Sequence, residues 1–171
     1  LSVFAGQITG IFGLVGSGRT ETFKVVSGVI KRDYTNGGEV FLNGKAVRYR
    51  VPAPAVRDGV AYITEDRKVE GFFETASIAR TLYHGLLAKF PAGRVLLSRR
   101  EQSASGTNWI KRLNVRAIGD EAKVIELSGG NQQKVVIAKS LVQEPDIIIF
   151  DEPTRGVDVG AIAEIHELIN R

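Results

Sequence analysis

The sequence predicts an α/β domain with a mainly parallel core sheet, a small antiparallel β portion and a helical subdomain. A glycine-rich turn, "GLVGSGRT" at 13–20, follows an apolar segment and precedes a segment with helical spacing. Every residue of "IIIF" at 147–150 is apolar, which is typical of a strand that is covered on both faces of a parallel sheet. Between about 77 and 113, apolar residues recur at helical spacing, which indicates a helical insert between two α/β portions.

The N-terminal part supplies candidate strands and one hairpin. The apolar run "GQITGIFG" at 6–13 predicts a buried strand, and a helix is expected from near Arg19 to a break around 28–30. Asn43 and Gly44 stand between two alternating segments, a strong signal for a two-residue hairpin. "GVAYIT" at 59–64 predicts another strand, with the charged cluster "EDRK" directly after it.

The rest of the chain predicts four helices and the apolar strand. Two helices are expected at about 77–90, ended by Pro91, and at about 98–113. Ser128 is the expected N-cap of a third helix, with Pro145 as its terminator, and "AIAEIHELIN" at 161–170 begins a fourth. The chain thus divides into a core portion at 1–70, a helical subdomain at 71–126 and a C-terminal portion at 127–171.

Composition limits the class of protein. The chain has 171 residues, 43% of them hydrophobic, which is enough for one domain with a core. It has no cysteine, which rules out disulfides and thiolate metal sites. The net charge of +4 is too small to indicate nucleic acid as a partner. The start lacks a methionine and the layout of a signal peptide, so we expect an internal segment of a longer protein, truncated at both ends.

The glycine turn has the spacing of a phosphate-binding loop. Glycines allow the backbone to bend tightly and to aim successive N–H groups at phosphate oxygens, and the following helix adds a favourable dipole. Thr20 stands where a hydroxyl would reach Mg²⁺. The candidate nucleotide-binding residues are Gly13, Gly16, Ser17, Gly18, Arg19 and Thr20.

A second candidate element follows the apolar strand. Asp151 and Glu152 stand at its carboxyl end, the edge where ligands bind in open α/β sheets. Asp151 is the expected metal ligand, and Glu152 is the expected catalytic carboxylate that orients water.

Four motifs together resemble one family. "LSGGNQQK" at 127–134 resembles the signature of ATP-binding-cassette (ABC) ATPases, and "DEPTRGVDVGA" at 151–161 resembles their Walker B and D-loop run. With "GRTE" at 18–21 and "EDRK" at 65–68, the chain resembles the second cassette of the two-cassette ATPase subunits of bacterial monosaccharide importers, of the ribose, galactose and xylose type.

This resemblance implies ATP and Mg²⁺ as ligands and a head-to-tail pair of cassettes, in which each ATP lies between one phosphate loop and the other signature. The partners would be the first cassette or a second copy, a transmembrane permease and, indirectly, a periplasmic sugar-binding protein, at the cytoplasmic face of the inner membrane. By the same resemblance, Asp158 is the D-loop aspartate and Glu65 replaces the usual glutamine beside the metal. The signature residues implied at the interface are Ser128, Gly129, Gly130 and Gln132.

Two departures from the general pattern indicate slow hydrolysis at this site. Arg19 replaces the phosphate-loop lysine with a bulkier planar cation, and Glu65 places a negative charge where an amide is usual. A non-catalytic regulatory cassette that lends its signature to a partner is therefore the alternative function. A DNA- or translation-associated ABC ATPase is a more distant one, which the subgroup motifs disfavour. The adenine-stacking residue would lie before Leu1 and the switch histidine after Arg171.

The remaining charged and titratable residues have simpler interpretations. His84 and His166 are expected to be surface residues on helices. Basic residues concentrate in the helical insert, as a solvated helix face or as an approach to the membrane partner and its anionic headgroups. These basic residues are Arg94, Arg99, Arg100, Lys111, Arg112 and Arg116.

Overall fold

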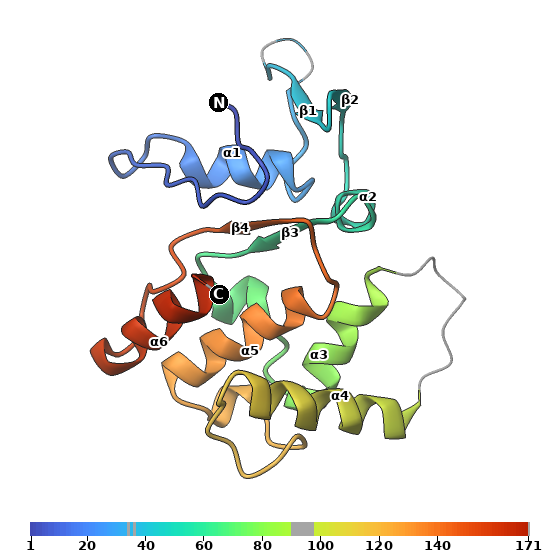
Figure 1. Cartoon of the computed structure of the whole chain (residues 1–171), viewed down its shortest axis with the longest axis vertical. Coiled ribbons are helices and arrows are strands. Elements are labelled where there is room, and N and C mark those ends of the chain that lie inside the picture. The colour runs from blue at the N-terminus through green and yellow to red at the C-terminus, as the bar shows by residue number, and fades with distance from the viewer. Residues whose placement is uncertain (34, 36, 90–97, 171) are drawn as a thin grey trace.

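The computed structural model describes residues 1–33, 35, 37–89 and 98–170 (Figure 1). Its α-helices are α1 (Arg19–Val26), α2 (Pro52–Arg57), α3 (Ile78–Leu87), α4 (Arg99–Arg112), α5 (Gly129–Leu141) and α6 (Val159–Ile169). Its strands are β1 (Val40–Leu42), β2 (Lys45–Val47), β3 (Val60–Ile63) and β4 (Ile147–Phe150). Two short turns of other helix types are η1 (Arg67–Gly71), a π-helix, and η2 (Val124–Glu126), a 3₁₀-helix.

The parallel pair of β3 and β4 stands at the centre of the fold. Val60 pairs with Ile147 and Ile63 with Phe150, so the two strands end at the same edge. The backbone N–H of Asp151 donates to the carbonyl of Ile63 and extends the pairing by one residue. Figure 1 shows α1 on one side of this pair and the helices α3, α5 and α6 on the other, so the sheet separates the phosphate loop from the helical layer.

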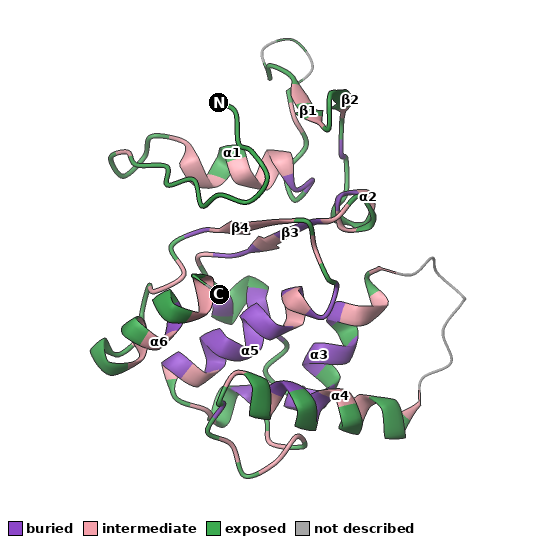
Figure 2. Cartoon of the chain, in the orientation of Figure 1, coloured by how far each residue is buried: buried purple, intermediate pink, exposed green. Residues whose placement is uncertain are grey.

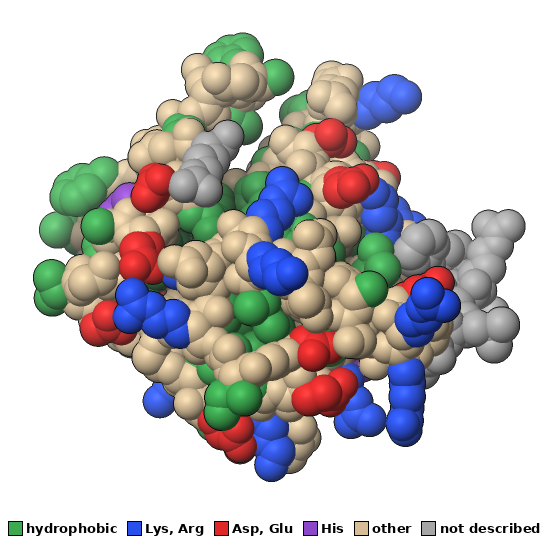
Figure 3. All heavy atoms as spheres, turned by 60° about the horizontal axis from the view of Figure 1, so that its bottom comes forward, with side chains coloured by type: hydrophobic (Ala, Val, Ile, Leu, Met, Phe, Trp, Pro, Cys, Tyr) green, Lys and Arg blue, Asp and Glu red, His purple; other side chains and the backbone are tan. Residues whose placement is uncertain are grey.

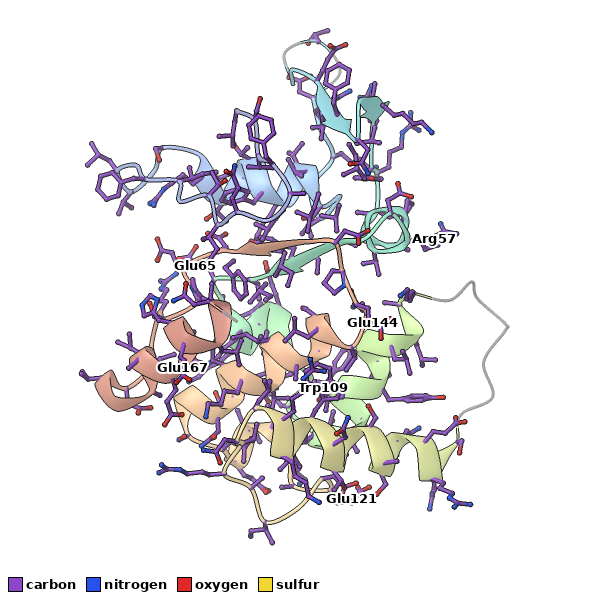
Figure 4. The ribbon with its side chains drawn as sticks, in the orientation of Figure 1. Arg57, Glu65, Trp109, Glu121, Glu144 and Glu167 are labelled. Atoms are coloured by element: carbon purple, nitrogen blue, oxygen red, sulfur yellow. The ribbon has the colours of Figure 1, made fainter. Side chains whose placement is uncertain are left out.

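The helical layer packs around α5 (Figure 2). Ser77 and Ser98 cap α3 and α4, because their hydroxyl oxygens accept hydrogen bonds from the N–H groups of Arg80 and Glu101. Trp109 of α4 is directed towards α3 and α5 (Figure 4). One core cluster joins these helices to both strands: its buried members are Ile63, Phe72, Ile78, Leu82, Trp109, Val115, Val124, Val135, Val136, Ile137, Ala138, Val142 and Ile165.

The hairpin lies where the sequence predicts it. β1 and β2 pair antiparallel, with Leu42 opposite Lys45 across the two-residue turn. Asn43 and Gly44 have φ of 50° and 77°, the positive values that such a turn requires. A second, smaller core of Tyr49, Ala55 and Val60 lies beneath the hairpin.

The expected strand at 6–13 is wrong. This segment has no regular secondary structure, and its apolar side chains are open to solvent, with Ile8 68% and Phe12 97% exposed. A strand exists only where a neighbour pairs with its backbone, and β3 and β4 pair only with each other in the described part of the chain. For the same reason β4 is half-buried instead of covered on both faces.

The other helices largely agree with their predicted bounds. α5 ends at Leu141, however, four residues before Pro145, and Glu144 in between has φ of 50°. The expected stop at Pro91 and the basic Arg94 lie outside the described residues. Among the described residues, none of the helices combines the length and the apolar character that a membrane span requires.

Candidate functional site

The glycine loop is an open turn in front of α1. The N–H of Ser17 donates to the carbonyl of Leu14 across 3.1 Å, and Gly16 and Gly18 have φ of 82° and 80°. Side-chain-bearing residues rarely adopt these angles, so the turn depends on both glycines. Gly13 makes room for the loop, because a Cβ there would lie 2.7 Å from the Ser17 hydroxyl oxygen. The loop therefore combines two positive-φ glycines with a helix N-terminus directly after it, features that anion-binding loops share.

Asp151 is a buried carboxylate at the carboxyl end of β4. It is 4% exposed, and the hydroxyl of Tyr62 donates to its Oδ2 across 2.8 Å. Burial, and then this hydrogen bond, raise the pKa of Tyr62 well above its usual range. The tyrosine therefore stays protonated and holds the carboxylate in one orientation. Tyr62 has no sequence signal of this role, because only the pairing of β3 with β4 brings it to Asp151.

Glu152, the expected catalytic carboxylate, is exposed and lies opposite the phosphate loop. Its φ is 43°, an unusual value for a residue with a side chain. Nη2 of Arg19 lies 3.7 Å from Oε1 of Glu152. The residue that replaces the loop lysine thus forms an ion pair with the candidate catalytic group.

Glu65 connects the phosphate-loop helix to the segment that follows β4. It lies just beyond β3, at the carboxyl end of the sheet (Figure 4). The hydroxyl of Thr20 donates to its Oε2 across 3.4 Å, and its Oε1 forms an ion pair with Arg155. The structure thus brings the expected metal-binding threonine beside the residue that takes the place of the usual glutamine.

The signature segment, residues 127–134, begins α5. Ser128 occupies the N-cap position, but its hydroxyl caps no backbone N–H and accepts a hydrogen bond from the Asn131 amide across 2.9 Å. Ser128 is exposed, Gly129 is half-buried and Gly130 is buried. Gly130 packs so closely on Ala161 of α6 that a Cβ would clash there. The expected capping hydrogen bond of Ser128 is therefore absent, while its exposed position agrees with the prediction.

Asp158 lies beside the signature segment. It is the exposed N-cap of α6, and a Cβ on Gly130 would lie 3.5 Å from its Oδ1. The site residues thus form two groups. Thr20, Glu65 and Arg155 join the phosphate-loop group, with Arg19 and Glu152 paired beside them, while Asp158 and the signature glycines form the second.

The histidines and most surface charges lie outside these groups. His84 and His166 are both exposed on helices, as predicted, and the ring of His84 packs edge-on against Phe73. Within the residues that the structure describes, no three histidine or carboxylate side chains gather as a metal site. On the face seen in Figure 3, basic and acidic side chains are interspersed, without a continuous patch of one sign.

A glycine loop before a helix, with carboxylates at the ends of the adjacent parallel strands, defines the P-loop nucleotide-binding class of α/β domain. The family model "ABC transporter" matches residues 1–155. The chain therefore belongs to the ABC transporter family.

Curated relatives and solved structures agree with this family. The chain is 44% identical over 163 residues to "Arabinose import ATP-binding protein AraG 2" of Burkholderia cenocepacia, covering 95% of this chain and 31% of that protein. It is 41% identical to "Ribose import ATP-binding protein RbsA" of Clostridium perfringens, covering 96% and 32%. The chain thus spans about a third of the length of the relatives it matches.

The solved structures support the fold. An ATP-binding cassette of an ABC transporter matches with a TM-score of 0.79 and 23% identity, over 99% of this chain and 67% of that one. A dimeric bacterial ABC transporter cassette matches with the same TM-score and identity, over 99% and 70%. The P-loop cassette fold predicted from the sequence is therefore confirmed.

Proposed function

We propose that this chain is the ATP-binding cassette of an ABC transporter that imports a monosaccharide, and that it is the second cassette of a two-cassette subunit. The observation that carries the proposal is the meeting of Thr20, Glu65 and Arg155 beside the Arg19–Glu152 pair, where the phosphate loop faces the ends of β3 and β4. The printed names of the relatives, arabinose and ribose import ATP-binding proteins, support the transport role.

The donor atoms at this edge fit Mg²⁺ with a nucleotide. Thr20 and Asp151 offer hydroxyl and carboxylate oxygens, the hard donors that Mg²⁺ prefers, and Mg²⁺ usually takes only one or two protein ligands beside phosphate and water. When bound, the metal would neutralise phosphate charge. Tyr62 keeps one oxygen of Asp151 engaged, so the carboxylate is held in a single orientation for this role.

The roles of the other residues follow from their positions. The N–H groups of the loop from Gly13 to Gly18 would bind phosphate oxygens, with the dipole of α1 behind them. Glu152 would orient the attacking water, since it is the exposed carboxylate opposite the loop. Glu65 holds the Thr20 hydroxyl and would sense whether the metal site is filled.

We propose further that this site hydrolyses ATP slowly. Catalysis needs interactions that strengthen as charge moves in the transition state. The Arg19 guanidinium pairs with Glu152 across 3.7 Å, so the cation and the candidate catalytic group engage each other. A forked cation in that geometry is poorly placed to follow charge onto the γ-phosphate, and Glu65 adds a negative charge nearby.

The signature group would serve the other cassette. Ser128 and Asp158 are both exposed and lie at neighbouring helix N-termini, which favour an anion. We infer that they contact ATP held by the first cassette or a second copy.

The remaining partners would be a permease and, through it, a periplasmic sugar-binding protein, at the cytoplasmic face of the inner membrane. We keep the division into portions at 1–70, 71–126 and 127–171 as part of this proposal.

The alternative is a cassette without hydrolysis that binds nucleotide and lends its signature to its partner. The intact Glu152 favours a cassette that hydrolyses ATP, because a purely regulatory site has no need of a catalytic carboxylate. The Arg19–Glu152 pair favours the alternative. The hydrolysing and the non-catalytic cassette would both bind nucleotide, and in both the signature would act on the ATP of the partner cassette.

The test of the shared proposal is Ser128→Arg in the two-cassette subunit, assembled with its permease. The bulky cation at an exposed helix N-terminus should abolish turnover at the other site, while labelled Mg-ATP still binds this cassette's own loop. Thr20→Val is the comparison variant, because it should weaken the binding of Mg-ATP at this cassette's own loop. Unchanged turnover with Ser128→Arg would contradict the proposed arrangement.

A further inference from the structure

The guanidinium of Arg67 is buried between two segments from distant parts of the chain. Arg67 is only 7% exposed, although it stands in the charged cluster "EDRK". Nη1 donates to the carbonyl of Arg155 and Nη2 to the carbonyl of Gly156, each across 2.7 Å. Nε donates to Oε1 of Gln132 across 3.4 Å. One side chain therefore bonds both the D-loop segment, residues 155–158, and the first turn of α5.

Gln132 extends these contacts to the backbone in front of the signature serine. It is 5% exposed, and its amide donates to the carbonyls of Ile125 and Leu127 across 3.2 and 2.9 Å. Leu127 immediately precedes Ser128. The conformation of the chain that presents Ser128 is thus fixed by Gln132, which Arg67 holds in turn.

The first signature glycine provides the space for this arrangement. A Cβ on Gly129 would lie 2.9 Å from Nη2 of Arg67 and 3.0 Å from the carbonyl oxygen of Gly156. Even a methyl group would push the guanidinium away from the two carbonyls that it serves. The absence of a side chain at 129 therefore has a structural reason inside this chain, besides any contact with a ligand.

We propose that Arg67 is a positioning residue that locks the signature segment and the D-loop segment together, so that both are presented as one unit to the nucleotide of the other cassette. This inference rests on the proposed function. Arginine suits the role because its planar fork donates in parallel to two adjacent carbonyls and to a third acceptor, and it keeps its charge when buried. Lysine offers a single donor centre and cannot serve both segments.

The experiment uses the two-cassette subunit with Glu152→Gln, so that turnover reports the other site alone. Arg67→Ala and Arg67→Lys should each lower kcat at that site on the order of 10- to 100-fold, as misplacement of a contact by about 1 Å does. Labelled Mg-ATP should still bind at this cassette's own loop, with an affinity that changes far less than kcat, because Arg67 bonds the backbone carbonyl of Arg155 and not the side chain that pairs with Glu65. Lys68→Ala, which removes an exposed charge from the neighbouring position, is the control and should leave both quantities unchanged.

Gly129→Ala provides a second route that leaves Arg67 in place. It should lower kcat in the same way, and the double variant with Arg67→Ala should show less than the product of the two effects, because both act on one contact. Full turnover in Arg67→Lys, or strictly multiplicative effects, would overturn the inference. If Ser128→Arg abolishes turnover while Arg67→Ala does not, the inference fails and the proposed function stands. If Ser128→Arg has no effect, the proposed function itself fails.

Discussion

The hydroxyl of Tyr62 on β3 donates a 2.8 Å hydrogen bond to the buried carboxylate of Asp151 at the end of β4. The contact spans 89 residues of sequence and exists because the two strands pair in parallel and end together. It holds the candidate metal ligand from within the chain, before any nucleotide binds.

Tyr62→Phe should therefore destabilise the fold and loosen Asp151. Removing the donor leaves a buried carboxylate oxygen without its partner, at a cost of about 1–3 kcal/mol in the free energy of unfolding. Urea unfolding of Tyr62→Phe and of the parent protein measures this cost. Equal stability of Tyr62→Phe and the parent protein would show that the hydrogen bond contributes nothing.

Arg19→Lys should raise ATP turnover at this site, measured in the two-cassette subunit with the first cassette's catalytic glutamate disabled. Lysine restores a compact cation at the phosphate loop and releases Glu152 from its ion pair. We expect an increase on the order of tenfold or more, the scale of one well-placed charge at a transition state. Arg19→Ala separates the two causes, because it frees Glu152 without supplying a cation. A rise of equal size in Arg19→Ala would place the effect in Glu152 alone.

Glu70 links the phosphate-loop helix to the end of β3 and should give the fold an acid-sensitive contribution. Lys24 Nζ of α1 and the Thr64 hydroxyl each donate to its carboxylate across 2.7 Å. Burial by itself raises the pKa of Glu70. The two hydrogen bonds together lower the pKa by more than burial raises it, so the net pKa lies below the ordinary value of 4.5.

The sign of the pH effect follows from that lowered pKa. The stabilisation is fully present above about pH 4.5 and is lost as the pH falls through the folded-state pKa. Glu70→Gln should cost less than about 1 kcal/mol near neutral pH, because the pair is partly exposed. Unfolding measured against pH should show the two proteins converging in acid, and a difference that grows in acid would contradict this.

The Tyr49 hydroxyl should lose its proton at a higher pH than an ordinary tyrosine. Burial first, and then the hydrogen bond to Asp58 across 2.7 Å, raise its pKa from 10.0 to about 12. The neutral tyrosine thus stabilises the fold below pH 10, and this stabilisation is lost as the pH rises towards 12. Ultraviolet difference titration should show Asp58→Asn moving this transition to lower pH. An unchanged transition would show that Asp58 has no part in it.

Local signals in the sequence explain why some elements could be predicted and others could not. Asn43-Gly44 needs positive φ at both positions, a requirement of the turn itself, so the hairpin is encoded locally. α5 has a serine at its N-cap position, two glycines and helical spacing in one continuous stretch. The segment at 6–13 has the composition of a strand, but strand formation also needs a hydrogen-bonded neighbour, which no local pattern supplies.

Candidate site residues could be predicted from the sequence where they belong to a recognisable motif. They could not be predicted where a side chain acts by bonding to the main chain of a distant segment. Glycine spacing and terminal carboxylates pointed to Thr20, Asp151 and Glu152 without a structure. Arg67 was visible only as one charge in a cluster, because its main acceptors are main-chain carbonyls 88 and 89 residues away. A buried arginine in a hydrophilic run gives no sequence signal of its burial.

The measurement that tests the account most directly is ATP turnover by the two-cassette subunit when the first cassette's own catalytic glutamate is replaced, so that only this chain's site can act. We predict that labelled Mg-ATP still binds at the phosphate loop of Gly13 to Thr20, while turnover falls close to background. Robust turnover that disappears on Glu152→Gln would contradict it, because the site with Arg19 at the loop would then be fully active.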